Sequence, residues 1–401
     1  MIPLTPPLSA VAISQSTVSN LQVDLGDVTA SQPALNVTVA TDSTTATTVA
    51  SGNTDTNSTV NGSLDVQSTQ VVGANVAAST TVNVASDAGA QTTLTTSATG
   101  NEIDAGSFEG GGPLTGTLNQ TAGPVQIRAD STFNGTNAQT GNGSMSVQAI
   151  GNTAGVTVQD TSANVTINQT STAQTEADGA ATLLYTPGTV TASAVAVSND
   201  MSAVGTGNAS QSLNVTQSMS GPLTQATQSF NVGNGQTVIT SASASSNNIS
   251  ISNENGPLNV VDNQTNTSFT FAQAVGSSFE FGTGQTIASG VGNSVLAGNA
   301  GQQMSIDNTQ SNVGNGTVVN ASFNGNNGFD ASSSATAMGN AVTGFACSDC
   351  GGVVNVSNNQ TNTAQVAATS TLGVTGPNRS VNGTAIAVGN NATFYVSKPS
   401  H

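Results

Sequence analysis

Apolar and polar residues alternate with a period of two along most of the chain. Ala192, Ala194 and Ala196, for example, are separated by a serine and a valine. Such alternation places every second side chain on the same face of a sheet. Glycine, asparagine and Gly-Pro pairs such as Gly112-Pro113 interrupt the pattern at short intervals. Because no segment sustains a 3.6-residue period, the pattern predicts an all-β chain with essentially no helix.

A short motif recurs along the whole chain. It consists of Ala or Gly, any residue, Gly or Ser, and then Asn, and successive copies lie 46 to 51 residues apart. The asparagines of the motif are Asn53, Asn101, Asn152, Asn199, Asn247, Asn293, Asn340 and Asn390. The constant phase predicts about eight copies of a 48-residue unit.

Glutamines recur in the same phase, 14 to 20 residues after the asparagines. They are Gln67, Gln120, Gln169, Gln217, Gln264, Gln310 and Gln360. We expect both residue types to form rows, the asparagines at a corner of each repeat, in which each amide bonds to the coils above and below. Because identical charges stacked in such a row would repel, the same architecture explains why only 6% of the residues are charged.

Regular short strands are typical of a propeller, a set of sandwiches or a solenoid. The chain has 3% aromatic residues and no Trp, which argues against propeller blades. The small residues Ala98, Ala149, Ala196 and Ala337, three positions before their asparagines, favour closely spaced sheets over a sandwich. The prediction is a β-solenoid of about eight repeats, each with four strands in two coils of about 24 residues, forming a rod about 80 Å long. Disorder is the alternative for so polar a chain, but abundant Val and Thr argue against it.

We expect one domain over residues 17–397, an extended tail over 1–16 and a short tail over 398–401. The start shows neither a basic segment nor an apolar segment. We expect that a signal peptide was removed before Met1, and a cytosolic start is the alternative. No stretch of 18 apolar residues is present, so no transmembrane helix is predicted.

Charge and histidine content exclude several functions. The chain has 3 Lys+Arg against 20 Asp+Glu, a net charge of -17. It therefore lacks the basic footprint needed for nucleic acid or for an anionic membrane surface. Its one histidine is the last residue, His401, which argues against Ser-His-Asp catalysis and His-ligated zinc. No enzyme, metal or cofactor is predicted.

The two cysteines, Cys347 and Cys350, predict a small structural disulfide in an oxidising compartment. A redox role and an intermolecular metal site are the alternatives. Glu102 with Asp104, and Asp24 with Asp27, either hold calcium or are solvated acids, and the second interpretation is favoured. The many Asn-x-Ser/Thr triplets leave glycosylation open.

Several segments resemble the holdfast anchor protein HfaD family of stalked alphaproteobacteria. The strongest are Cys347-Ser-Asp-Cys350-Gly-Gly, Asn359-Gln-Thr-Asn-Thr and Gly389-Asn-Asn-Ala-Thr-Phe-Tyr-Val, and earlier segments at Gly62 and Ala98 are similar. The resemblance implies an exported outer-membrane protein with no catalytic residues. It also implies a curli-type secretion lipoprotein and other holdfast anchor subunits as partners, and an extracellular polysaccharide adhesin as the tethered ligand. The Asn- and Gln-rich rows also resemble curlin-type amyloid subunits, whose repeats are about half as long.

The function expected from the sequence is a non-enzymatic, self-associating surface protein that anchors an adhesive polysaccharide holdfast to the outer membrane. Two alternatives stay open: a phage or secreted fibre that binds glycans, and a carbohydrate-active enzyme on a β-helix.

Overall fold

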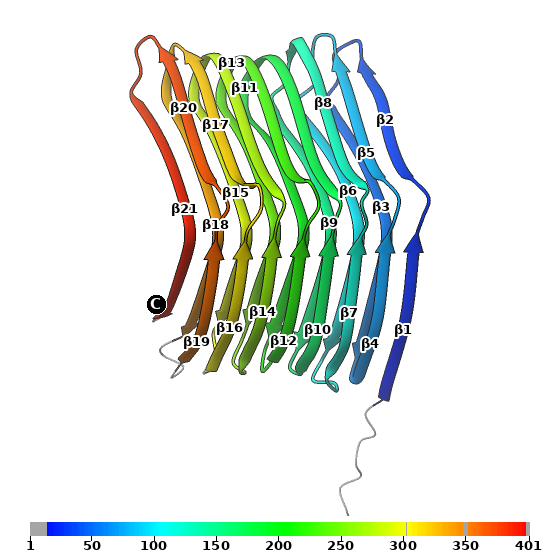
Figure 1. Cartoon of the computed structure of the whole chain (residues 1–401). Coiled ribbons are helices and arrows are strands. Elements are labelled where there is room, and N and C mark those ends of the chain that lie inside the picture. The colour runs from blue at the N-terminus through cyan, green and yellow to red at the C-terminus, as the bar shows by residue number, and fades with distance from the viewer. Residues whose placement is uncertain (1–13, 302, 348–351, 398–401) are drawn as a thin grey trace, which may run out of the picture.

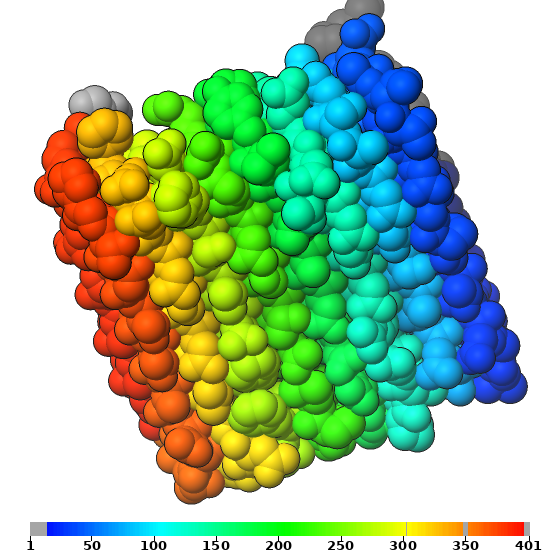
Figure 2. Space-filling view, turned by 90° about the horizontal axis from the view of Figure 1, so that it is seen from above, coloured from blue at the N-terminus to red at the C-terminus, as the bar shows by residue number. Residues whose placement is uncertain are grey.

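The computed structural model describes residues 14–301, 303–347 and 352–397. Over these residues the chain forms 21 strands and no helix, and it winds into a β-solenoid (Figure 1). Successive turns lie side by side from the N-terminal end to the C-terminal end, as the coloured bands of Figure 2 show. The predicted all-β solenoid is therefore confirmed.

One turn consists of three strand segments. In the second turn they are β4 (Gly62–Val72), β5 (Val76–Val84) and β6 (Gln91–Phe108). The first runs up the lower part of one layer, the second continues into its upper part, and the third returns along the opposite layer (Figure 1). We call these the lower front, upper front and back strands. The chain then enters β7 (Leu114–Ala122), which pairs in parallel with β4.

Each repeat therefore makes one turn and not the two that the sequence analysis proposed. Ser14 lies opposite Gly62, and Leu64 lies opposite Leu114, so the register between turns equals the repeat length. The expected coil of 24 residues is wrong because the strands are long: the three segments of the second turn have 11, 9 and 18 residues. The expected four strands per repeat become three. At about 4.8 Å per turn the rod is about 40 Å long, half the expected length.

The lower front sheet has one strand per turn, in the order β1-β4-β7-β10-β12-β14-β16-β19. Its other strands are β1 (Ser14–Asp24), β10 (Ser162–Ser171), β12 (Ser210–Met219), β14 (Leu258–Asn266), β16 (Gln303–Asn312) and β19 (Val353–Asn362). Because β1 begins at Ser14, the last three residues of the expected N-terminal tail belong to the solenoid.

The upper front and back strands join into one sheet of 13 strands, because three strands continue from one layer into the other. The continuous strands are β11 (Gln174–Thr206), β13 (Leu223–Asn253) and β15 (Phe269–Asn299). The remaining upper front strands are β2 (Val28–Val37), β8 (Gln126–Gln139), β17 (Gly316–Asn326) and β20 (Val366–Thr375). The remaining back strands are β3 (Ser43–Val60), β9 (Asn142–Gln159), β18 (Gly328–Cys347) and β21 (Ser380–Ser397).

Apolar side chains, from alanine to leucine and isoleucine, fill two large cores between the layers. The upper core lies between the upper front strands and the first halves of the back strands, and includes the predicted Ala98, Ala149, Ala196 and Ala337, each 0% exposed. The lower core lies between the lower front sheet and the second halves of the back strands, where Leu118 and Ile167 are buried. We call the level between the two cores the waist.

The asparagine motif lies at the waist, inside each back strand. In β6 every second residue from Thr92 to Ala98 is buried, then Gly100 and Asn101 are both buried, and the alternation resumes with Ile103. The in–out phase thus shifts by one residue, as it does at a β-bulge. The expectation that these asparagines mark a corner of the repeat is wrong, because they lie within continuous strands.

Candidate functional site

The motif asparagines form one hydrogen-bonded row along the waist. Each Nδ2 from Asn53 to Asn340 donates to the Oδ1 of the next asparagine, at 2.7–2.9 Å. The second proton of each Nδ2 goes to a backbone carbonyl at the end of a lower front strand, at 2.8–3.1 Å. The row therefore ties turn to turn and back layer to front layer.

A glutamine row runs beside it on the lower front strands. Each Nε2 donates to the Oε1 of the preceding glutamine, at 2.7–3.2 Å. Its second proton goes to a backbone carbonyl of the back strand, at 2.6–3.1 Å. The members are Gln22, Gln70, Gln120, Gln169, Gln217, Gln264, Gln310 and Gln360.

One glutamine assigned to this row from the sequence is wrong. Gln67 points outward from β4 and donates to Asp65 Oδ1 at 3.2 Å, whereas Gln70 is 0% exposed and lies in the row. The spacing carries one signal of this, because Gln70 follows Asn53 by 17 residues, as Gln169 follows Asn152. Gln22 belongs to the same row one turn earlier and was not assigned to it from the sequence.

The two rows have opposite polarity. Asparagine donors point toward the C-terminal turn, whereas glutamine donors point toward the N-terminal turn. A backbone carbonyl can only accept, so the nitrogen of each amide must be the atom that faces it. This second bond fixes the amide orientation and hence the direction of each row.

The outer face of the lower front sheet carries a second kind of polar row. Asn119, Asn168, Thr216, Asn263 and Thr309 lie opposite one another on successive strands. Asn168 donates to Asn119 at 2.9 Å, and the later members are exposed. The result is a flat surface on which hydroxyl and amide groups repeat at the spacing of the turns.

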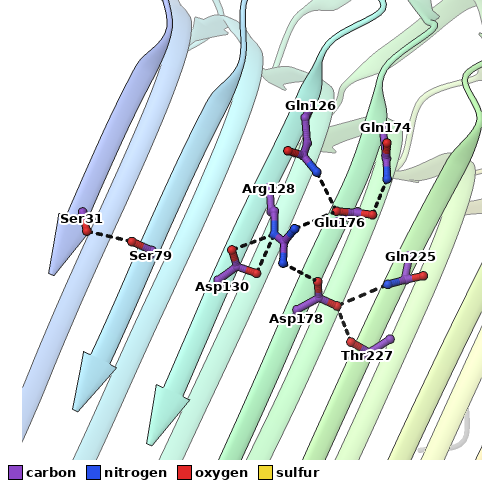
Figure 3. Close-up of polar contacts among 10 residues, drawn as sticks. All are labelled: Ser31, Ser79, Gln126, Arg128, Asp130, Gln174, Glu176, Asp178, Gln225 and Thr227. Carbon is purple, nitrogen blue, oxygen red and sulfur yellow. Dashed lines mark hydrogen bonds and ion pairs between the residues drawn. The ribbon is translucent and has the colours of Figure 1, made fainter. Parts of the chain in front are cut away.

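A charged cluster lies on the outer face of the upper front strands (Figure 3). Arg128 on β8 bonds to Asp130 through Nε at 2.7 Å, and it approaches Glu176 and Asp178 on β11 at 3.6 and 3.4 Å. Gln126 donates to Glu176 at 2.9 Å. Three carboxylates around one guanidinium leave this patch acidic.

The cluster borders a groove of about 500 Å³ that crosses β8, β11, β13 and β15. Asp130, Asp178 and Thr227 are among its lining residues, and Thr227 bonds to Asp178. Desolvation raises the pKa of Asp130, although its hydrogen bond with Arg128 opposes that shift. The cluster cannot be identified from the sequence without the register, because residues 48 positions apart are remote in sequence and adjacent in the solenoid.

The other candidate residues lie apart from these surfaces. Burial raises the pKa of Glu102, and the neighbouring Asp104 carboxylate adds to the shift. Asp24 and Asp27 accept backbone N–H groups of Gly26 and Asn75. Over the described ranges, no three His, Cys, Asp or Glu side chains converge as a metal ion would require.

Cys347 ends β18 at 9% exposure. Its proposed partner Cys350 lies outside the described residues, so the disulfide stays a prediction. His401 and the tail over residues 398–401 also lie outside the described part. In the parts of the chain that the structure covers, none of the secondary structure is a helix able to cross a membrane.

Comparison with known proteins places the chain in one family. The family model for holdfast attachment protein D matches residues 38–316, more than half of the 401 residues. No curated protein and no solved structure matches the chain. The match spans turns that the asparagine and glutamine rows hold together, and the chain belongs to the holdfast attachment protein D family.

Proposed function

We propose that this protein is a non-enzymatic, multimerising anchor that holds an adhesive polysaccharide at the outer membrane. Family membership implies a role in holdfast attachment and a location at the cell surface. The observation that carries the finer proposal is the flat outer row of Asn119, Asn168, Thr216, Asn263 and Thr309. Such groups hydrogen-bond sugar hydroxyls without a deep pocket.

Many weak contacts then replace one tight site. A single hydrogen bond contributes about 1 kcal/mol. Because the rows repeat turn after turn, a polymeric ligand engages several of them, and linked contacts raise avidity by roughly 10²–10⁴. The curli-type secretion lipoprotein and the other anchor subunits are proposed as partners on the basis of family membership alone.

The cellular experiment is deletion of the gene, followed by lectin staining of the adhesive on cells and in the medium. The anchor function predicts that polysaccharide is still secreted but is shed. Firmly retained adhesive, or a strain that makes none, would contradict the proposal.

A matched pair of variants tests the surface directly. Asn263→Leu and Thr309→Leu together remove polar groups from the outer row, whereas Asn231→Leu changes an exposed asparagine on the other front sheet. We expect the double variant to lose co-sedimentation with purified holdfast polysaccharide and Asn231→Leu to retain it. Equal binding by the double variant and by Asn231→Leu would show that the outer row does not bind the polysaccharide.

A further inference from the structure

The solenoid has two open ends, and their geometries are complementary. At the N-terminal end, β1, β2 and β3 each pair on one side only, with β4, β5 and β6. At the other end, β19, β20 and β21 pair only with β16, β17 and β18. The strand lengths nearly match, at 11, 10 and 18 residues against 10, 10 and 18. Figure 2 shows the two turns at opposite ends of the molecule.

The amide rows end in opposite groups at the two ends. At the N-terminal end the last row atoms are Asn53 Oδ1, an acceptor, and Gln22 Nε2, a donor that uses one proton on Thr54 O. At the C-terminal end they are Asn390 Nδ2, a donor, and Gln360 Oε1, an acceptor. Over the described residues, no side-chain amide of the chain itself completes these four groups. A donor at one end therefore faces an acceptor at the other, in both rows.

The two ends of the solenoid also carry opposite charges. Residues 14–60 contain Asp24, Asp27, Asp42 and Asp55 and no Lys or Arg, whereas residues 352–397 contain Arg379 and no Asp or Glu. Two N-terminal ends placed together would oppose four acids to four acids. An N-terminal end on a C-terminal end opposes acids to a cation.

If the register within the solenoid continues from one copy to the next, it determines which residues of the two copies lie opposite each other. Ser380 lies in the same row as Asp330, Thr283 and, at the far end of the chain, Ser43. One position earlier, Arg379 of one copy falls opposite Asp42 of the next. Arg379 is 74% exposed and binds Asp330 through Nε at 3.0 Å, which holds it at this edge. Asp42 is exposed.

We propose that copies of this chain stack head to tail, with the first turn of one copy added in parallel register to the last turn of another. Gln22 then donates to Gln360, Asn390 donates to Asn53, and Arg379 pairs with Asp42. The pairing is carried by β1 on β19 and β3 on β21. In β2 a bulge between Gln32 and Leu35, which contains Pro33, interrupts the edge, as proline often does on edge strands.

The stacking rests on the proposed function, in which the protein multimerises. It specifies that the partner is a second copy of the chain and that the copies join head to tail. Its test uses purified full-length chain without polysaccharide, so it fails or succeeds independently of holdfast anchoring. We expect wild-type protein to form rods that lengthen with concentration in sedimentation and electron microscopy.

Charge-reversal variants test the head-to-tail orientation of the stacked copies. Asp42→Arg places a cation at both ends, and Arg379→Asp places an acid at both ends, so each variant alone should associate at least about tenfold more weakly. An equimolar mixture of the two should recover association, because unlike ends meet again. Thermal unfolding of each variant checks that the fold is intact. A wild-type protein that stays monomeric, or a mixture no better than its components, would overturn the proposal.

Disulfide cross-linking of introduced cysteines tests the register between the stacked copies. Ser43→Cys and Ser380→Cys chains, mixed and oxidised, should form a covalent dimer, because the two Cα atoms would lie about 4.8 Å apart, within disulfide range. Asn382→Cys, two residues out of register, replaces Ser380→Cys in the control mixture. A dimer from Ser43→Cys alone, or equal yield in the control, would show a different arrangement.

Discussion

Asp262 offers the sharpest test of how the buried rows stabilise this fold. It lies in β14 at 2% exposure, between Val215 on one neighbouring strand and Asn308 on the other. Neither carboxylate oxygen has a hydrogen-bond partner within the described chain, and burial raises its pKa well above the usual value. The adjacent Asn308 Oδ1 has no partner either.

Asp262→Asn should remove the buried charge and give Asn308 Oδ1 a donor. Asn308 Nδ2 already donates to Asn358 Oδ1 at 2.7 Å, toward the C-terminal turn. An amide at position 262 would donate to Asn308 Oδ1 in the same direction and extend this row. Satisfying a buried acceptor contributes about 1–3 kcal/mol, so we expect the free energy of unfolding at pH 7 to rise by about that amount.

The pH dependence separates charge from hydrogen bonding. In the unfolded chain Asp262 titrates near pH 4. Because its folded pKa is raised, folding binds a proton, and its contribution to stability falls as pH rises from about 4 through the raised value. The gain from Asp262→Asn should therefore be larger at pH 7 than at pH 4.

Urea denaturation at both pH values measures these gains, and Asp307→Asn is the control because it removes the same charge from an exposed neighbour. We expect Asp307→Asn to change stability by less than about 0.5 kcal/mol. A gain equal at both pH values would refute the ionisation argument. A loss of stability at pH 7 would refute the inward placement of Asp262.

Three other predictions follow from the buried residues. Ala196→Phe should lower the unfolding free energy by about 1–3 kcal/mol in thermal or urea unfolding, because Ala196 is fully buried and a ring at this position overpacks the core; no loss would contradict its burial. Gln169→Leu breaks a row with buried partners and should cost at least about 1–3 kcal/mol, whereas Gln67→Leu should cost less than about 0.5 kcal/mol; equal losses would contradict the corrected row. If Cys347 and Cys350 are paired, thiol titration after unfolding without reductant should find close to zero free thiols, and two free thiols would disprove the pairing.

The fold class could be predicted because two independent periods agree in the sequence. The period of two fixes which side chains face inward, and the recurrence of the asparagine motif fixes the spacing of equivalent positions. Neither period says how many strands one turn contains. The same 48-residue recurrence results from one turn of 48 residues with three long strands and from two turns of 24 residues with short strands. Only the pairing of the strands in the structure shows how many turns one repeat makes.

The amide rows were only partly predictable for a similar reason. Asn101 and Asn152 carry a distinct motif, whereas glutamines are common enough for Gln67 and Gln70 to compete for one position. Burial decides between them, and alternation within β4 places Gln70 inward with Val66. The Arg128 cluster needs the register itself, since Arg128 lies opposite Glu176, and Asp130 opposite Asp178, only when the 48-residue turn is known.

The opposite directions of the two waist rows have a consequence for a long stack. In an α-helix, aligned peptide dipoles add along the axis and leave partial charges at the ends. Amide side chains aligned in a single row would add in the same way, and their summed dipole would grow with each turn. Here the Asn101 and Gln120 rows run side by side in opposite directions, so their axial dipoles oppose each other in every turn. A head-to-tail rod can therefore lengthen without accumulating a net axial dipole from these rows, while each new joint still satisfies one donor and one acceptor in both.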